Sequence, residues 1–366
     1  MKKVNNRIAL GSKIIDFLRC IVMPQNQIIA LLFTSLLTTY FAYRQIHIFT
    51  PLEPPPLLLE LTPKQFRAWD CEPVEIKTGL QVINFSGFNL VDNEFLVDVI
   101  VWFEFDPSLV SLDLVSKFLF DKGEIKKKSA PITRSIDGKF FAEYEVRFSF
   151  SSNVTHQFFP LDDHRIYITL INNVASPMDV VFDASPSGFT VSDSIFIRGW
   201  EIVSTGVNTG YEEWVFDKHE DRRTIRHPKV VYSIDFKRSG NRFIFLIFLP
   251  IFLIFFIGLF SFAFSPEDSN SRSVIMSLAS ASLASLLGYR FVINNMAPSG
   301  VGYFMLSDHI FNLFLTLAFL ELFVAINLIQ LQKLTTTVVV VRGALFILFH
   351  IALLAVWYYL LFLWIK

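Results

Sequence analysis

Four apolar segments occupy the last third of the 366-residue sequence, at positions 243–264, 274–293, 310–330 and 338–364. Each is close to the roughly 20 residues that a helix needs to cross a bilayer. With 52% apolar residues and a mean hydropathy of +0.47, the chain is too hydrophobic for a purely soluble protein. We therefore predict a four-helix transmembrane bundle over residues 243–366.

The second of these segments lies within residues 271–298, and six of residues 271–285 are serine. At about 100° per residue of an α-helix, small or hydroxyl-bearing residues and one phenylalanine share a sector: Ser273, Ser277, Ser280, Ala281, Ala284, Gly288 and Phe291. We call this set the small-residue stripe. It can let neighbouring helices approach closely, or it can line water where several copies assemble. The helix alone does not decide between the two.

Residues 57–242 consist of short alternating apolar runs separated by turn residues, such as EFLVDVIVWFEFD at 94–106 and KFFAEYEVRFSF at 139–150. Many short strands with turn signals between them predict an antiparallel β-sandwich or barrel. Residues 51–242 hold 28 acidic and 21 basic residues. Neither this balance nor the total charge of −1 suggests nucleic acid as a partner.

The N-terminal residues 1–27 carry five basic residues and one acid, and they precede an apolar run at 28–43. By the positive-inside rule, this end stays in the cytoplasm if the run is not cleaved. The run is about sixteen residues long, between a signal-peptide core and a full span, so a signal anchor and a signal peptide both stay open. We expect a multi-pass protein of the cell membrane with the β-region outside, either periplasmic or extracellular.

Motifs for catalysis or metal binding are absent from the sequence. It contains two cysteines, Cys20 and Cys71, and no CxxC, HExxH, GxSxG or Gly-rich phosphate loop. Nucleophile, metal and phosphate sites usually carry such signatures. We therefore expect no enzyme activity, no cofactor and no metal site.

Several strings, in this order along the chain, resemble the pentameric ligand-gated ion channels (the Cys-loop receptor superfamily), particularly bacterial members without the Cys-loop disulfide. They are FFPLDDH at 158–164, RSGNRFIFLIFLP at 238–250, RFVINNMAP at 290–298 and the Tyr303 and Asp308 of YFMLSD. The resemblance covers roughly residues 80–365. It implies a homopentamer in which each subunit has an outer β-sandwich that binds a ligand and four helices, the second lining the pore. The N-terminal hydrophobic segment is an addition to that pattern.

The resemblance also implies roles for individual residues. The small-residue stripe would line a pore for inorganic ions, and Phe291 is the best bulky candidate for a closed gate, because Ala284 and Gly288 are too small. Residues that couple the two domains would be Phe159, Pro160, Asp162, Asp163, Arg238, Pro298, Tyr303 and Asp308, with either aspartate of the first loop pairing with Arg238. Aromatic rings of such sites hold cations or amines, and the candidates here, which edge packing would equally explain, are Phe105, Trp200, Tyr211 and Trp214.

Selectivity and conduction are argued from the residues themselves. Glu267, Asp268 and the negative β-region favour cations, whereas Arg272 opposes them. A second class of function is a membrane-anchored ligand-binding or signalling protein that reuses the channel fold without conducting. Two features favour it: the stripe lacks the ring of leucines that usually gates such channels, and the N-terminal segment is unexplained. The expected partners are four further copies of the chain, membrane lipid, a small-molecule or ionic ligand and permeant ions.

Overall fold

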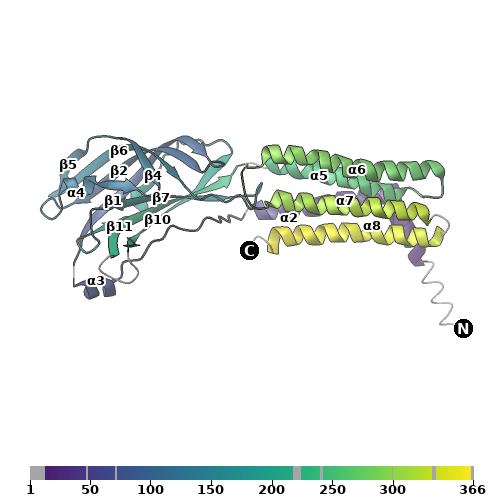
Figure 1. The fold of residues 1–366 in the computed structure, drawn as a ribbon, viewed down its shortest axis with the longest axis horizontal. Coiled ribbons are helices and arrows are strands. Elements are labelled where there is room, and N and C mark those ends of the chain that lie inside the picture. Colours follow the sequence, from purple (N-terminus) through teal and green to yellow (C-terminus); the bar gives the residue numbers. More distant parts are fainter. Residues whose placement is uncertain are drawn as a thin grey trace. The chain divides into compact units, whose positions relative to one another are not determined.

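The computed structural model describes residues 13–46, 48–70, 72–216, 224–239, 242–298, 300–331 and 335–363. Its contacts divide the chain into two units. We call Thr50–Thr155 with Asp163–Ser239 the β-domain, and Met1–Phe49 with His156–Asp162 and Gly240–Lys366 the helical unit. Strands belong to the first unit and the long helices to the second (Figure 1).

The β-domain contains two sheets, and its short helices are α3 (Pro63–Trp69) and α4 (Leu112–Ser116). The seven-stranded sheet has the order β4-β6-β2-β1-β8, with β5 paired to β6 and β9 paired to β1. Its strands are β1 (Val74–Asn89), β2 (Glu94–Phe105), β4 (Gly123–Lys128), β5 (Ile132–Ile136), β6 (Lys139–Ser151), β8 (Val180–Asp183) and β9 (Phe189–Val191). The four-stranded sheet, in the order β10-β11-β7-β3, comprises β10 (Trp200–Val215), β11 (Thr224–Arg238), β7 (His164–Asn172) and β3 (Phe118–Phe120).

Both sheets contribute to one hydrophobic core. After the exposed Glu94, strand β2 alternates buried and half-buried residues, as expected of a strand with one face on a core. Rings from the two sheets meet there: Phe85 lies 5.7 Å from Phe236, and Phe189 lies 4.9 Å from Tyr232, centroid to centroid. The predicted β-rich region is thus confirmed.

The sheets differ from the expectation in one respect, because we predicted antiparallel pairing throughout. Strands β8 and β9 both pair with β1 in parallel, so the larger sheet is mixed, whereas the smaller sheet is antiparallel. The parallel strands are only four and three residues long. Strand β5 is exposed at every position, so no apolar alternation could reveal it.

Four helices are long and apolar enough to span a membrane, which confirms the prediction of a membrane protein. They are α5 (Arg242–Leu259), which continues as η3 (Phe260–Ala263), α6 (Ser269–Met296), α7 (Leu306–Gln330) and α8 (Thr335–Tyr358), which continues as η4 (Tyr359–Leu363). They run roughly side by side within the helical unit (Figure 1). Their shared core is built largely from phenylalanine and leucine, for example Phe255, Phe314 and Leu353.

The N-terminal apolar run lies within α2 (Pro24–Ile46), a helix that packs against α8. The indole Nε1 of Trp357 donates to the backbone oxygen of Thr38 at 3.2 Å, and the Thr34 hydroxyl lies 2.8 Å from Nδ1 of His350. A short helix, Lys13–Ile21, precedes α2 at an angle of 71°, and the bent pair is a fifth candidate span. The run that we expected to be an anchor or a signal peptide is therefore also a packed part of the helical unit.

We expected residues 57–242 to form the β-region. One loop within that range, His156–Asp162, belongs to the helical unit instead. The backbone N–H groups of Leu306 and Ser307 donate to the carbonyl oxygens of Gln157 and Phe159, at 2.7 and 3.0 Å. These bonds join the loop to the first residues of α7, where a helix leaves its N–H groups without intrahelical partners. The clustering accordingly places His156–Asp162 with the helices.

Candidate functional site

Helix α6 presents two faces of opposite character. Its buried residues recur at helical spacing on the side packed against the other helices: Ile275, Ala279, Ser282, Leu286 and Ile293. All seven residues of the small-residue stripe are exposed in the single chain. At 100° per residue the centres of the two sets lie about 180° apart. The structure thus brings the predicted stripe together on one open face of α6.

Local sequence signals set both ends of α6. The Asp268 carboxylate caps the N-terminus by accepting from the Ser271 N–H at 3.1 Å, as short acidic side chains do at this position. At the other end Ala297 has an extended backbone, which Pro298 imposes on the residue before it. These signals explain why the helix begins at Ser269 and ends at Met296.

The small-residue stripe changes in character along α6. Phe291 is 73% exposed, while a Cβ added to Gly288 would meet no atom within 4 Å. The upstream positions Ser277 and Ser280 carry hydroxyls, and the Ser280 Oγ donates to the backbone oxygen of Met276 at 2.6 Å. The stripe is thus polar over its first half and ends in one large ring.

A buried acid lies behind α6. Glu321 of α7 is 0% exposed, and neither carboxylate oxygen has a hydrogen-bond partner within the described residues. A Cβ added to Gly258 of α5 would lie 2.2 Å from Glu321 Oε2 and 2.8 Å from the Ser282 Oγ. A side chain at residue 258 would therefore force Glu321 or Ser282 to shift where α5, α6 and α7 meet. An acid within a membrane helix is costly against lipid and is expected to face protein or water, and the burial of Glu321 meets this expectation.

Asp308 of α7 contacts both the start of its own helix and the end of α6. Its carboxylate accepts from the Met305 N–H at 2.8 Å and lies 2.7 Å from Nη1 of Arg290 on α6. That nitrogen does not point at an acceptor, so we treat the contact as an ion pair rather than an aligned hydrogen bond. Arg290 also lies over the Phe311 ring at 5.0 Å. Asp308 therefore joins the end of the pore-helix candidate to the start of α7.

We expect Asp308→Ala to lower the free energy of unfolding by about 1–2 kcal/mol, the range for losing a helix cap with a charged partner. Asp308→Asn keeps an oxygen for the Met305 N–H and loses only the charge, so its effect should be smaller. Thermal unfolding of the full-length protein in detergent measures both. Equal losses in the two variants would contradict the capping role.

Other predicted coupling residues lie near the start of α7, in the loop at 156–162 and in the segment between α6 and α7. The Tyr303 hydroxyl accepts from the His156 N–H at 2.8 Å, Phe159 is 2% exposed within the helical core, and the bond between Phe159 and Pro160 is cis. Pro298 and Tyr303 line one shallow pocket with Asp308. Within the helical unit, the structure therefore assembles Phe159, Pro298, Tyr303 and Asp308 around the start of α7.

The charged coupling residues each have partners of their own. Asp162 lies 3.3 Å from Nδ1 of His156, and the Asp163 carboxylate accepts from the Thr50 N–H at 3.4 Å. The Arg238 guanidinium lies over the Trp200 ring at 4.5 Å. Pairing of Asp162 or Asp163 with Arg238 stays a prediction.

The candidate ligand residues do not form one cluster. Phe105 is 1% exposed in the β-domain core, so its ring is not available to a ligand and we remove it from the candidates. Tyr211 is 5% exposed, and its hydroxyl accepts from Nε2 of Gln65 at 3.0 Å. Trp214 is 40% exposed and lies 4.7 Å from His227. Residues three apart on a strand point to opposite faces, so Tyr211 and Trp214 do not share one.

The proline-rich linker at residues 51–56, PLEPPP, contains a buried acid that the sequence did not single out. Glu53 is 6% exposed; one carboxylate oxygen lies 2.8 Å from Nδ1 of His164, and the other accepts from the Arg165 N–H at 3.0 Å. The Arg165 side chain binds Asp235 through two hydrogen bonds, which raise the pKa of Arg165 above its ordinary value. The linker is thus fixed to β7. Its only sequence signal is a lone acid among prolines.

No protein-family model matches the sequence, and the search of curated proteins found no significant match.

Proposed function

We propose that the protein is a subunit of a homopentameric ligand-gated ion channel of the cell membrane. In this proposal the two sheets form an outer β-sandwich that senses a ligand, α5–α8 form the transmembrane bundle, and α6 lines the pore. The observation that carries it is the open face of α6, on which all seven stripe residues are exposed. The number of subunits rests on the resemblance of the strings at 158–164, 238–250, 290–298 and 303–308 to the pentameric channel family.

The exposed stripe supports a pore on physical grounds. Among the four single-helix candidate spans, α6 is the least buried: 22% of its most apolar 18-residue stretch is buried inside the structure, against 56% for the span that contains α5. A membrane helix gains little by showing serines to hydrocarbon, so a hydroxyl-bearing face is expected to meet protein or water. Five copies would place Ser273, Ser277 and Ser280 in stacked rings, where hydroxyls replace part of an ion's hydration shell.

Cation selectivity is part of the proposal. Glu267 and Asp268 precede the first turn of α6, and acidic rings at a pore mouth attract cations. Arg272 lies within the first turn and acts in the opposite direction. The proposal therefore predicts reversal potentials in asymmetric salt that follow the cation, and potentials that follow chloride would overturn this part.

A second candidate function is a ligand-binding or signalling protein that uses this architecture without conducting. The observation that favours it is the small size of Ala284 and Gly288, which leaves Phe291 as the one large ring of the stripe. A pore without a mid-membrane constriction would have to close at that ring or remain open. Current from the purified pentamer decides between the two candidates.

The decisive experiment combines planar-bilayer recording with cysteine accessibility. In a background with Cys20→Ser and Cys71→Ser, Ala281→Cys on the stripe is expected to react with a water-soluble thiol reagent and to lose most of its current. Ala279→Cys is the matched control, because Ala279 is 0% exposed on the packed face. Equal sensitivity of both variants would reject α6 as pore lining. A confirmed pentamer that passes no current under any tested ligand, pH or calcium concentration would favour the second function.

A further inference from the structure

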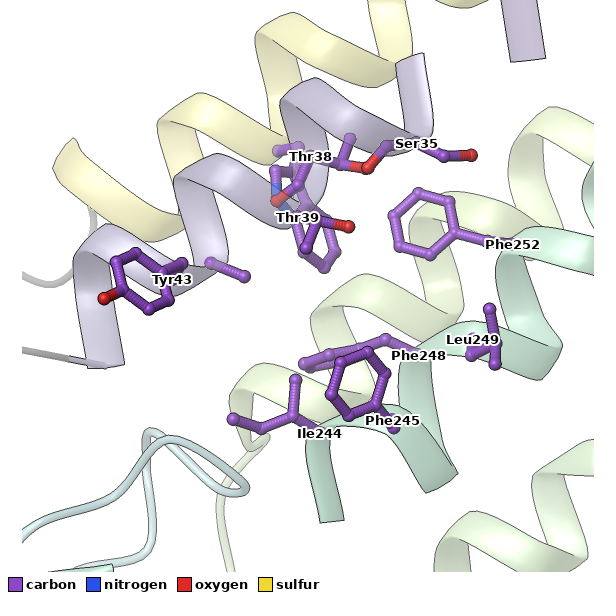
Figure 2. Close-up of a pocket in the computed structure, with 11 residues that line it drawn as sticks. Ser35, Thr38, Thr39, Tyr43, Ile244, Phe245, Phe248, Leu249 and Phe252 are labelled. Atoms are coloured by element: carbon purple, nitrogen blue, oxygen red, sulfur yellow. The ribbon is translucent and has the colours of Figure 1, made fainter. Parts of the chain in front are cut away.

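The short helix Lys13–Ile21 lies at 71° to α2, and α2 is aligned with the spans. Figure 2 shows α2 and α5 on facing walls of a groove, with Tyr43 and Ile244 at one end and Ser35 and Phe252 at the other. With 23 residues, α2 is long enough to cross a bilayer by itself. The short helix is therefore steeply inclined to the spans and does not continue one of them.

The short helix lies level with the end of the first span. Leu18 is 8% exposed and packs on Gly343 of α8, where an added Cβ would lie 2.7 Å from the Leu18 Cβ. Beside Gly343, the Arg342 side chain donates from Nε and Nη2 to the backbone oxygen of Phe262, at 3.1 and 2.6 Å. Phe262 belongs to the end of the span Ile244–Ala263. Because that span ends there, the short helix lies at the boundary between hydrocarbon and headgroups.

Apolar and polar side chains occupy separate sectors of the short helix. At about 100° per residue, the apolar residues share one arc of about 160°, in the order Phe17, Ile21, Ile14, Leu18 and Ile15. The polar residues fill the remaining sector, in the order Arg19, Asp16, Cys20 and Lys13. Leu18 packs on α8, whereas Phe17 and Ile14 are 59% and 50% exposed. The described part of the protein thus leaves one side of the apolar arc open.

The charged residues of the short helix are arranged as on helices that lie in a membrane interface. Lys13 and Arg19 each lie about 40° outside one edge of the apolar arc, whereas Asp16 lies at the middle of the polar sector. All three are exposed. Long basic side chains at such borders keep their stems on apolar surface and extend their charges to lipid phosphates. The acid, in the middle of the polar sector, points towards water.

We propose that the short helix binds the lipid surface of one leaflet: its open apolar side enters the bilayer, and Lys13 and Arg19 contact the phosphates of anionic lipids. The leaflet is the one at the Ala263 end of the first span. With the β-domain outside, this is the cytoplasmic leaflet. Through Leu18, the short helix ties α8 to the membrane surface, a role that neither an anchor nor a signal peptide requires. The proposal needs only that the helical unit spans a membrane, so it is independent of the proposed channel activity.

Two other arrangements would cover the open apolar side less well. A bend that re-enters the membrane would carry Phe17 and Ile14 towards the bilayer centre, but it would also take three charged side chains out of water, which is costly. A second copy of the chain would bury little more than these two side chains here, far less than the roughly 800 Å² per partner of a stable interface. Lipid at the interface covers the apolar side and leaves the polar sector in water.

The test measures depth in the full-length protein, reconstituted in vesicles of phosphatidylcholine with a minor fraction of phosphatidylglycerol. In a background with Cys20→Ser and Cys71→Ser, a fluorophore is attached to Ile14→Cys or Phe17→Cys on the open side. Asp16→Cys, in the polar sector, is the matched control. Quenching by lipids that carry nitroxides at graded depths is expected to place the labels at 14 and 17 about 5–10 Å inside the headgroup boundary. The label at 16 should instead be quenched by iodide in the water.

Three outcomes would overturn the proposal. Similar quenching of all three labels would show that the helix has no lipid side. Labels at 14 and 17 near the bilayer centre would indicate a re-entrant bend. Shielding of both labels from lipid and from iodide would indicate a second copy of the chain.

Charge variants test the phosphate contact separately. Phosphatidylglycerol with a nitroxide near its headgroup should quench the label at 17 more strongly than phosphatidylcholine with the same nitroxide. Lys13→Gln combined with Arg19→Gln should lower this preference about fivefold or more. Asp16→Asn, which changes the charge of the same helix in the opposite direction, should raise it. An equal preference in all these proteins would overturn the contact between the basic residues and lipid phosphate.

Discussion

Alanine at Gly258 is expected to lower the free energy of unfolding of the protein by about 1–3 kcal/mol, the cost of forcing an extra methyl group into a packed interior. The added Cβ would lie 2.2 Å from Glu321 Oε2 and 2.8 Å from the Ser282 Oγ. Ser282 can yield little, because its hydroxyl donates to the Ile254 backbone oxygen at 2.9 Å. Thermal unfolding of the detergent-solubilised full-length protein measures the loss.

The same substitution at Gly288 is the matched control, because it is another helical glycine of a membrane span. No atom lies within 4 Å of a Cβ there, and alanine costs less backbone entropy than glycine in a helix. We therefore expect Gly288→Ala to be neutral or to stabilise by about 0.5–1 kcal/mol. A loss at Gly288 as large as that at Gly258 would show that helix geometry, not the contact with Glu321, sets the effect.

A double variant identifies the clashing partner. Glu321→Ala removes the carboxylate that meets the added methyl group, although it also leaves a cavity. If the Glu321 contact dominates, Gly258→Ala combined with Glu321→Ala should lose less stability than the sum of the two single losses. If the stability loss of the double variant equals the sum of the two single losses, the clash is with Ser282 instead.

Helix α6 has one packed face and one open face. Behind the helix, the Ser282 hydroxyl donates to the Ile254 backbone oxygen of α5 at 2.9 Å, and Glu321 of α7 lies buried nearby. In front, the stripe is exposed, and no residue that the structure describes in the helical unit buries it. In the proposed assembly, this open front would face the neighbouring copies.

Much of the architecture follows from periodicity in the sequence. The four spans were predictable from the length and apolar composition of their segments. The opposed faces of α6 were predictable from the helix repeat, which places its small residues and its packed residues on opposite sides. Phe105 shows the limit of resemblance. The alternation of Phe95, Val97, Val99, Val101 and Phe103 already places it on the buried face of β2, and the resemblance assigned it to a ligand site instead.

Other features could not be predicted because they depend on residues far apart in the sequence. Thr34 and His350 are separated by 316 positions, and nothing local in either helix specifies that they meet. Glu53 likewise depends on a bond to the backbone of Arg165. Such contacts decide that the N-terminal helix and the linker are fixed parts of the protein, whereas composition alone suggests an anchor and a spacer.

The largest expected functional effect is at Phe291. If five copies surround a pore, their Phe291 rings form the one bulky apolar constriction of the stripe, and such a ring closes a pore by excluding water. Phe291→Ala is then expected to raise the resting conductance about tenfold or more, which corresponds to about 1.4 kcal/mol in the balance between closed and open states. Planar-bilayer recording without ligand measures this change.

The neighbouring residue provides the control for this prediction. Val292 is 43% exposed, but it is rotated by about 100° from Phe291 on the helix and lies outside the stripe. Val292→Ala also removes apolar surface near the end of α6, but outside the stripe, so it should leave the resting current near its original level. Because Ala284 and Gly288 cannot narrow a pore, an unchanged resting current in Phe291→Ala would leave the stripe without a gate. The protein would then have to close through a movement of α6 itself, or not conduct at all.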